Sequence, residues 1–505
     1  MAASKKIIAA LHANWWLNLA GLFLSFVGSV VLVRALPHQL YAQYGAVLAI
    51  IGVATLVFEA GANSGLTRYL REAADRKARG TFYIRMQRRR ALAAAACACA
   101  LVLLGPIYAR NTQLGGAASE RWLFVIIALI VAGTLTKLLA HYGLLALFEA
   151  RTALLLQQGF LVLRSATLAG IAVAGGGLRA ITGALLAITI IEALVVHFRL
   201  WRLLRGEREP LPGAFVNRAQ TFGLYTVFDK GCAMLGSGSV ILLVLASNHS
   251  AAVIAALALA VDLVGKAVSL TVMPMGNLVA PYLSHATDDR AEQGRAIARV
   301  LKLSSLLYAF TIGAALLLFP SFVHVVYGGK YDLAILLTLV LLVPTAFENW
   351  IRGCCSPALL RNQCFAPLLK LNLVQAVATL ATLALVRHAS VEVVVATVGG
   401  VRAAIASFNL VLLRRLLPPH SFHVPLQGAL VGVMSCALAY GWGSLLPLAA
   451  VPRDLLEGLA FALLFYLGLR WVVFRDRDTL HLAHRLTGNR TGLFRRLLPP
   501  APLHT

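Results

Sequence analysis

The chain has 505 residues, of which 59% are hydrophobic and only 13% are charged. Because soluble domains average about 25% charged residues, this composition excludes an ordinary soluble protein and predicts a membrane protein. The net charge is +25, but the basic residues lie between apolar runs rather than on one soluble face, which argues against nucleic-acid binding.

Apolar runs of about 20 residues recur along the chain, and this is the length that crosses a hydrocarbon layer of about 30 Å as a helix. The first run is too long for a signal peptide and no cleavage pattern follows it, so we expect an uncleaved first span. In chain order the predicted transmembrane helices are 14–34, 41–64, 91–108, 122–147, 153–175, 180–202, 219–246, 251–281, 300–326, 332–351, 366–386, 390–413, 425–448 and 455–474.

The basic residues are distributed unevenly between the two sides of these fourteen spans. With the N-terminus placed inside, 33 of the 45 basic residues fall in cytoplasmic segments, seven in outside connections and five within spans. This bias predicts that both termini are cytoplasmic. The segment 66–90 carries nine basic residues and is interpreted either as an amphipathic helix on the anionic inner leaflet or as a topology determinant alone.

The two halves of the chain show a weak internal similarity. GSVVLVRALPHQLYAQYGAVLAI (28–50) aligns with GSVILLVLASNHSAAVIAALALA (238–260) at an offset of 210 residues. We therefore predict an all-α polytopic membrane protein with two six-helix lobes, related by a pseudo-two-fold axis along the membrane normal, plus two accessory helices. The predicted parts are an N-terminal lobe (1–205), a cytoplasmic linker (206–218), a C-terminal lobe (219–415), the accessory helices (416–475) and a basic cytoplasmic tail (476–505).

Two stretches near the N-terminus, RALPHQLYAQYGAVLAI (34–50) and FEAGANSGLTRYLREA (58–73), resemble the opening of bacterial polysaccharide flippases. These are the O-antigen and exopolysaccharide transporters of the multidrug/oligosaccharidyl-lipid/polysaccharide exporter superfamily. The matching positions are Arg34, Leu36, Tyr41, Tyr44, Gly45, Glu59 and Gly61.

The resemblance implies a V-shaped pair of six-helix lobes in the bacterial inner membrane. It also implies that the protein moves an undecaprenyl-diphosphate-linked oligosaccharide from the inner to the outer leaflet, alongside a polysaccharide polymerase and glycosyltransferases. One departure concerns charge: members of that family often have a clearly cationic cavity, whereas the charges inside these spans cancel.

Ten ionisable residues fall inside the predicted spans, where an unpaired charge costs several kcal/mol. Each is interpreted either as one partner of an ion pair between helices or as part of a wet central cavity. In the cavity, basic groups bind the diphosphate, and acidic groups bind sugar hydroxyls or carry protons. The guanidinium groups suit bidentate phosphate contact best. The basic residues are Lys137, Arg164, Lys230, Lys266 and Arg402, and the acidic ones are Glu59, Glu192, Asp229, Asp262 and Glu348.

The stretch GLYTVFDKGCAML (223–235) places Asp229 and Lys230 side by side in an apolar run. Adjacent residues on a helix point about 100° apart, so these two cannot pair with each other. Asp262 and Lys266 on the next span are four residues apart and share one helix face. We therefore expect Asp229 to face Lys266, or Lys230 to face Asp262.

Gly, Ser and Pro interrupt two neighbouring spans, at GSGS (236–239) and MPMGN (273–277). These residues permit kinks and close helix contacts, as a moving scaffold needs, although packing alone also accounts for them.

Three other functions remain as alternatives to a lipid-linked oligosaccharide flippase. A drug/cation antiporter of the same superfamily predicts a more acidic cavity, and a peptidoglycan-precursor flippase is a close relative. A membrane polymerase or ligase needs a larger outside loop than the roughly 13 residues available here. No P-loop is present and none of the seven cysteines forms a CxxC pair, so no ATP drive, metal or other cofactor is expected. The sugar, the energy source and the oligomeric state stay open.

Overall fold

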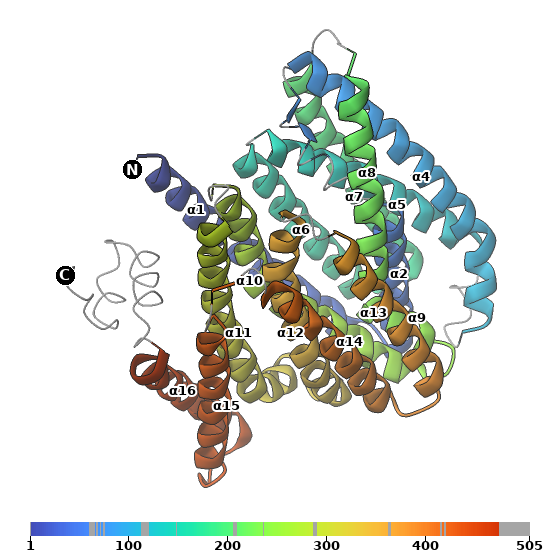
Figure 1. Ribbon diagram of the computed structural model, residues 1–505. Coiled ribbons are helices and arrows are strands. Elements are labelled where there is room, and N and C mark those ends of the chain that lie inside the picture. Colours follow the sequence, from blue (N-terminus) through green and yellow to red (C-terminus); the bar gives the residue numbers. More distant parts are fainter. Residues whose placement is uncertain are drawn as a thin grey trace. The chain divides into compact units, whose positions relative to one another are not determined.

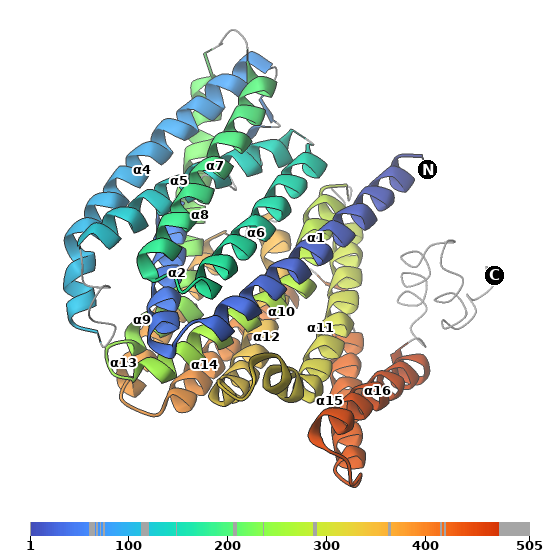
Figure 2. The same cartoon turned by 180° about the vertical axis from the view of Figure 1, so that it is seen from behind.

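The computed structural model describes residues 2–59, 66, 69–70, 72–73, 76–112, 121–147, 149–205, 210–235, 237–285, 290–361, 365–414, 417–418 and 421–473. These residues form helices and short turns and include no strand, which confirms the predicted all-α fold. Apolar runs fold this way because a helix satisfies its backbone hydrogen bonds internally, as a bilayer requires. Figures 1 and 2 show the helices from the two sides.

The helices follow one another with short connections. The first nine are α1 (Ala2–Ala35), α2 (His38–Phe58), α4 (Arg76–Arg110), α5 (Arg121–Ala146), α6 (Ala150–Val173), α7 (Leu178–Leu204), α8 (Gly213–Met234), α9 (Gly238–Leu245) and α10 (Ala251–His285). The remainder are α11 (Arg290–Tyr327), α12 (Asp332–Arg361), α13 (Phe365–Val386), α14 (Val391–Arg414), α15 (His423–Gly443) and α16 (Ala450–Gly468), which continues into a π-helical turn, Leu469–Val473.

Each of the fourteen predicted spans overlaps a helix, and twelve helices in the described part of the chain are long and apolar enough to cross a membrane. Two predicted spans differ from the rest. The first contributes a shorter apolar helical segment, Leu19–Ala35, and the seventh is divided between α8 and α9. The chain is therefore a multi-pass membrane protein.

By its contacts the chain divides into two compact units. Unit 1 comprises Met1–Val261 and Asn372–Val394, and unit 2 comprises Asp262–Leu371 and Val395–Thr505. Helices α10, α13 and α14 each contribute residues to both. The lobe boundaries expected from the sequence stay a prediction.

In unit 1 the helix α5 packs against α4 and α7, while α1 packs along α6. Figure 2 shows this second pair side by side. Helix α5 is the central element, and its side chains Ile127, Val131, Leu135 and Leu139 are fully shielded from solvent. A helix buried on this scale holds the polar side chains that it carries in fixed positions.

The basic segment 66–90 is packed differently from what the sequence suggested. Its described part from Arg76 onward is the start of α4, and Phe82 and Tyr83 are buried in a cluster with Leu139, Leu200 and Phe215. The apolar face of this stretch is thus covered by α5, α7 and α8 rather than by lipid. An amphipathic helix lying on the leaflet is therefore wrong for residues 76–90.

The seventh predicted span breaks at the GSGS stretch. Helix α8 ends at Met234, and α9 begins at Gly238 with Ser237 as its N-cap, whose Oγ accepts a hydrogen bond from the Val240 amide. A Cβ added at Gly238 would lie 2.8 Å from Val261 on α10, so the two helices approach closely here. The expected interruption and close contact are both confirmed. Helix α10 runs through 273–277, whose side chains lie outside the described set.

Unit 2 is organised around α11, which packs against α12, α15 and α16. The rings of Phe310, Phe461 and Phe465 form a cluster with centroids 5.6 Å apart. Gly313 makes room for it, because an added Cβ would lie 2.3 Å from the Phe461 ring. The accessory helices α15 and α16 are therefore an integral part of this unit.

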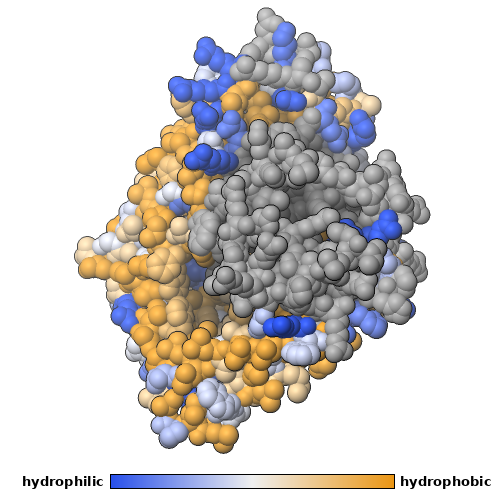
Figure 3. Space-filling model, turned by 90° about the vertical axis from the view of Figure 1, so that its left-hand side faces the viewer, coloured by the Kyte–Doolittle hydropathy of each residue, from blue (hydrophilic) through white to orange (hydrophobic). Residues whose placement is uncertain are grey.

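Large apolar side chains remain exposed on the described helices. Examples are Leu103 (69%), Leu194 (65%) and Leu459 (68%). Figure 3 shows hydrophobic residues over much of the coloured part of one face, with hydrophilic residues gathered at the top of the view. Exposure of this kind is typical of helices that face lipid rather than water.

Replacement of Gly45 by alanine is expected to destabilise the protein by about 1–3 kcal/mol, because the new methyl group overpacks the α2–α10 contact. A Cβ at this position would lie 2.5 Å from the Cβ of Ala258. Gly170→Ala is the matched control, since nothing lies within 4 Å of its Cβ position on α6. It should instead stabilise by about 0.5–1 kcal/mol. Thermal unfolding of both variants in detergent checks this, and equal melting temperatures would contradict it.

Candidate functional site: a cationic cluster within the spans

Eight of the ten predicted intramembrane charges have described side chains. Unit 1 holds Glu59, Lys137, Arg164 and Glu192, and unit 2 holds Asp262, Lys266, Glu348 and Arg402. The side chains of Asp229 and Lys230 lie outside the described set, so their expected pairing with Asp262 and Lys266 stays a prediction.

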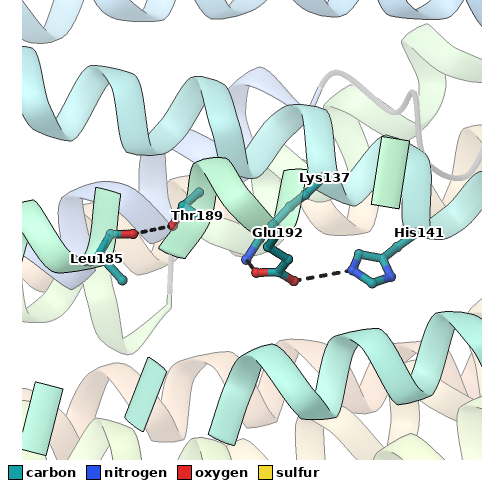
Figure 4. Close-up of polar contacts among 5 residues, drawn as sticks. All are labelled: Lys137, His141, Leu185, Thr189 and Glu192. Atoms are coloured by element: carbon teal, nitrogen blue, oxygen red, sulfur yellow. Dashed lines mark hydrogen bonds and ion pairs between the residues drawn. The ribbon is translucent and has the colours of Figure 1, made fainter. Parts of the chain in front are cut away.

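Three residues from α5 and α7 form a polar triad in unit 1, shown in Figure 4. The Nζ of Lys137 donates to one carboxylate oxygen of Glu192 at 2.5 Å, and Nε2 of His141 lies 3.3 Å from the other oxygen. The side chain of Lys137 is 13% exposed, and those of Glu192 and His141 are each 8% exposed. One carboxylate therefore serves two nitrogen groups in a buried setting.

Local helix geometry positions this triad. Lys137 and His141 are four residues apart, so they project from the same face of α5. On α7 the Thr189 hydroxyl, one turn before Glu192, donates to the Leu185 carbonyl oxygen at 2.7 Å. A Cβ at Gly133 would lie 3.0 Å from the Thr189 methyl carbon, so this glycine lets α5 and α7 approach closely enough for the ion pair to form.

Arg164 on α6 adds a second cation to this region. Its side chain is half-buried, and its charge is close enough to Lys137 for the two to repel each other. Among the described residues no ion pair or hydrogen bond to its guanidinium is found. Lys137, Arg164 and Glu192 together carry a surplus of one positive charge. The cluster can therefore accept an anionic group.

Unit 2 contains a second cationic cluster, centred on Glu348. One Glu348 oxygen contacts Nη2 of Arg402 on α14, and the other lies 3.0 Å from Nε of Arg352. Glu348 is 3% exposed and Arg402 is 11% exposed. Two guanidinium groups thus share one buried carboxylate, so these three side chains together carry a net charge of +1. Arg402 takes part in an ion pair between helices, and its expected phosphate contact stays a prediction.

Asp262 and Lys266 share one face of α10, as their spacing predicted, and there they pair with each other. The Nζ of Lys266 donates to Asp262 Oδ2 at 2.5 Å. The side chain of Lys266 is 22% exposed and that of Asp262 is 41% exposed. This pair carries no net charge and is more accessible than the two clusters above. Its role in binding a substrate stays a prediction.

Glu59 lies at the end of α2 and is 5% exposed. Its backbone carbonyl oxygen accepts a hydrogen bond from Nη1 of Arg90 at 3.0 Å, and Arg90 is itself only 2% exposed. Nearby, the Tyr83 hydroxyl lies 3.0 Å from Nδ1 of His197. The arrangement ties α2, α4 and α7 together at one end of unit 1.

Several members of these sites were not predicted from the sequence. His141 and Arg352 each follow a predicted intramembrane charge by four residues, and that spacing was the available signal. Arg90 was counted as an ordinary loop charge. Glu457, 2% exposed on α16, was also missed, although it follows Arg453 by four residues. Its Oε1 lies 3.6 Å from the Arg453 Nε. Across the described part of the chain, no group of His, Cys, Asp and Glu side chains gathers as a metal site.

Glu192→Gln is expected to destabilise the protein by about 1.5–3 kcal/mol, because the Lys137 ammonium then loses its charged partner in a buried position. The double variant Lys137→Gln/Glu192→Gln should recover most of this loss. Glu149→Gln is the control, since Glu149 and Arg199 lie 3.7 Å apart and their side chains are 34% and 46% exposed, respectively. Melting temperatures in detergent report the effects. A double variant no more stable than Glu192→Gln would show that the pair does not act as a unit.

Comparison with known proteins gives one family and one fold. A family model described as polysaccharide biosynthesis protein matches residues 13–287, which is more than half of the chain. Searched against curated protein sequences, the chain has no match.

Solved structures share the fold at low sequence identity. The chain resembles the lipid II flippase MurJ in an inward closed conformation, with a TM-score of 0.72, 11% identity, and coverage of 93% of this chain and 99% of that one. An inward-facing MATE family multidrug resistance transporter of the MOP superfamily matches with a TM-score of 0.57 and 13% identity, over 80% of this chain and 98% of that one. A MOP superfamily transporter from Pyrococcus furiosus matches with a TM-score of 0.54 and 14% identity, over 86% of this chain and 96% of that one.

Proposed function

The chain belongs to the polysaccharide biosynthesis protein family, and on this premise we propose that it flips a lipid-diphosphate-linked oligosaccharide across the bacterial inner membrane by alternating access. The product serves cell-surface polysaccharide synthesis, such as that of O-antigen or exopolysaccharide. A polymerase and glycosyltransferases act before or after this step. The protein itself acts as a transporter and not as an enzyme.

The observation that carries this proposal is the surplus positive charge around Arg164. The residue lies 13 positions into the apolar span Arg151–Val173, about 20 Å along the helix from its start. A cation at that depth costs free energy, so its presence there indicates a function. A diphosphate is the part of a lipid-linked oligosaccharide that a guanidinium and an ammonium together bind best.

The acidic residue of the cluster suggests how binding is made reversible. Glu192 holds Lys137 when no anion is present, so an arriving phosphate competes with a carboxylate for the same ammonium. His141 shares that carboxylate. Exchange of partners within the triad is therefore a route by which the bound anion is released again.

A peptidoglycan-precursor flippase is the second candidate, because the chain covers almost the whole of the lipid II flippase in the fold comparison. The drug/cation antiporter alternative draws on the fold shared with the MATE transporters. The net positive charge of the two described clusters disfavours it, since cationic drugs need acidic partners. The polymerase or ligase alternative requires chemistry on the outer side of the membrane.

Both termini are expected in the cytoplasm from the bias of basic residues. Reporter fusions at each end and in the turn between α11 and α12 test this orientation. The two ends should report one side and the turn the other. The same side for all three reporters would contradict the assignment.

Deletion of the gene in the native bacterium, followed by an assay of the sidedness of the lipid-linked oligosaccharide, tests the function. A flippase predicts accumulation on the cytoplasmic face with surface polysaccharide lost. Export of single unpolymerised units would point to a polymerase instead. Rescue of a strain depleted of its lipid II flippase, with surface polysaccharide unaffected by the deletion, would favour the peptidoglycan-precursor candidate.

A further inference from the structure

An exposed stack of aromatic rings and arginines lies at the C-terminal end of α7. The rings of Phe198 and Trp201 stack with centroids 6.4 Å apart and an interplanar angle of 24°. The guanidinium of Arg202 lies 4.4 Å from the Phe198 ring centre, and that of Arg205 lies 5.4 Å from the Trp201 ring centre. The two aromatic residues are 51% and 47% exposed. We call these four residues the α7 ladder.

The ladder continues an apolar stripe along one face of the same helix. Ile191 is 50% exposed and Leu194 is 65% exposed, and Phe198 and Trp201 follow at the three- and four-residue spacing of one helix face. A stripe of exposed apolar side chains on a membrane-spanning helix faces acyl chains. The ladder therefore stands where that lipid-facing stripe meets the polar end of the helix.

The other end of α7 carries a matching aromatic–arginine pair, so the distance between the two pairs can be compared with the thickness of a bilayer. There the Arg179 guanidinium lies 5.0 Å from the centre of the Trp122 ring on α5. Arg179 and Arg202 are 23 residues apart on one continuous helix, or about 34 Å at 1.5 Å per residue. The hydrocarbon core of a bilayer is about 30 Å thick. The two aromatic–arginine pairs thus mark the two membrane–water interfaces, where Trp is enriched.

Charge complementarity identifies what binds at the ladder. Arg199 and Arg202 lie in the last turns of α7 and Arg205 follows the helix directly, while Glu149 contacts Arg199, with its Oε2 3.7 Å from Nη2. The rings hold the guanidinium planes of Arg202 and Arg205 in place, which reduces the entropy lost when an anion binds. A ligand with a phosphate at interface depth and acyl chains beside the apolar stripe satisfies both parts of this surface.

We propose that the α7 ladder binds the phosphate headgroup of an anionic phospholipid, with Arg202 and Arg205 as the phosphate donors and Phe198 and Trp201 as the rings that orient them. By the charge bias, this lipid comes from the cytoplasmic leaflet. The ladder consists of exposed residues, whereas the Lys137–Glu192–His141 triad is buried. The inference holds whether or not the protein is a flippase.

The test titrates purified full-length protein with phosphatidylglycerol and, in parallel, with phosphatidylcholine, counting bound lipids by native mass spectrometry. The variant Arg202→Gln/Arg205→Gln is expected to weaken phosphatidylglycerol binding at least tenfold with phosphatidylcholine binding unchanged. The control Arg85→Gln/Arg88→Gln removes the same charge from exposed positions of α4 that the bias places on the same side. It should weaken binding by less than twofold.

Two further measurements separate a specific site from general attraction. Arg202→Lys/Arg205→Lys keeps the charge but loses the planar donors, so it should give an intermediate loss. Melting temperatures of all variants should match the unmodified protein, which shows that they fold. Equal losses in the ladder variant and the α4 control would overturn the proposal, as would full binding by the ladder variant. Displacement of the lipid by millimolar inorganic phosphate would overturn it too, by showing a free-phosphate site.

Discussion

Replacement of Arg164 by glutamine is expected to lower transport of the lipid-linked oligosaccharide about 10- to 100-fold without lowering the amount of folded protein. A charge-assisted hydrogen bond is worth about 1.5–3 kcal/mol, and each 1.4 kcal/mol is a factor of ten in binding. Because the Lys137–Glu192 pair does not depend on Arg164, the variant keeps the contact that joins α5 to α7. The loss should therefore fall on substrate binding and not on stability.

The measurement is surface polysaccharide in a deletion strain that expresses each variant at a matched membrane level. Arg151→Gln, at the exposed start of the same helix, is the control and should retain full export. Arg164→Lys should fall between the two, since an ammonium supplies the charge without the bidentate geometry. Full export by Arg164→Gln would remove Arg164 from the substrate site, and a parallel fall in protein level would assign it to folding.

Replacement of Glu348 by glutamine is expected to give the largest loss of stability, about 3–5 kcal/mol, because it leaves two guanidinium groups without their shared carboxylate. Glu348 is 3% exposed and contacts both Arg352 and Arg402. Removing Arg402 as well, in Glu348→Gln/Arg402→Gln, takes away the more deeply buried of the two guanidinium groups. The double variant should therefore regain most of the loss.

Thermal unfolding in detergent, together with the yield of monodisperse protein, measures this effect. Asp332→Asn is the matched control, because Asp332 begins the same helix and its side chain is 62% exposed. Its melting temperature should stay close to that of the unmodified protein. If Glu348→Gln melts with this control, the carboxylate is not what holds α12 to α14.

The positions of the helices were predictable because span length is set by bilayer thickness. An apolar run such as 180–202 has one physical interpretation, a transmembrane helix, and α7 occupies Leu178–Leu204. The break in the seventh span was also foreseeable, since the Gly and Ser residues at 236–239 weaken a helix and Ser237 is a good N-cap. The shared helix face of Asp262 and Lys266 also followed from their four-residue spacing, although the sequence did not predict that they pair with each other.

Contacts between helices were not predictable in the same way. Lys137 and Glu192 are 55 residues apart, and nothing in either span names the other as its neighbour. Arg402 was assigned to phosphate by its chemistry, but only tertiary packing decides that it meets Glu348. Arg90 was read as a loop charge because its burial depends on α4 docking against α2, which a single sequence does not reveal. The ladder on α7 was overlooked because exposure is a property of the folded unit.

The most direct test of the proposed function is transbilayer movement by the purified protein. Proteoliposomes carrying a labelled lipid-linked oligosaccharide are treated with an impermeant enzyme that modifies only the sugar exposed on the outside. A proton gradient, a sodium gradient and a membrane potential are imposed in turn. The flippase proposal predicts that the fraction of sugar protected from the enzyme falls with time under at least one condition. In vesicles with the Arg164→Gln variant this fraction should fall far more slowly than in vesicles with the unmodified protein. A protected fraction that stays equal to that of protein-free liposomes under every condition would contradict it.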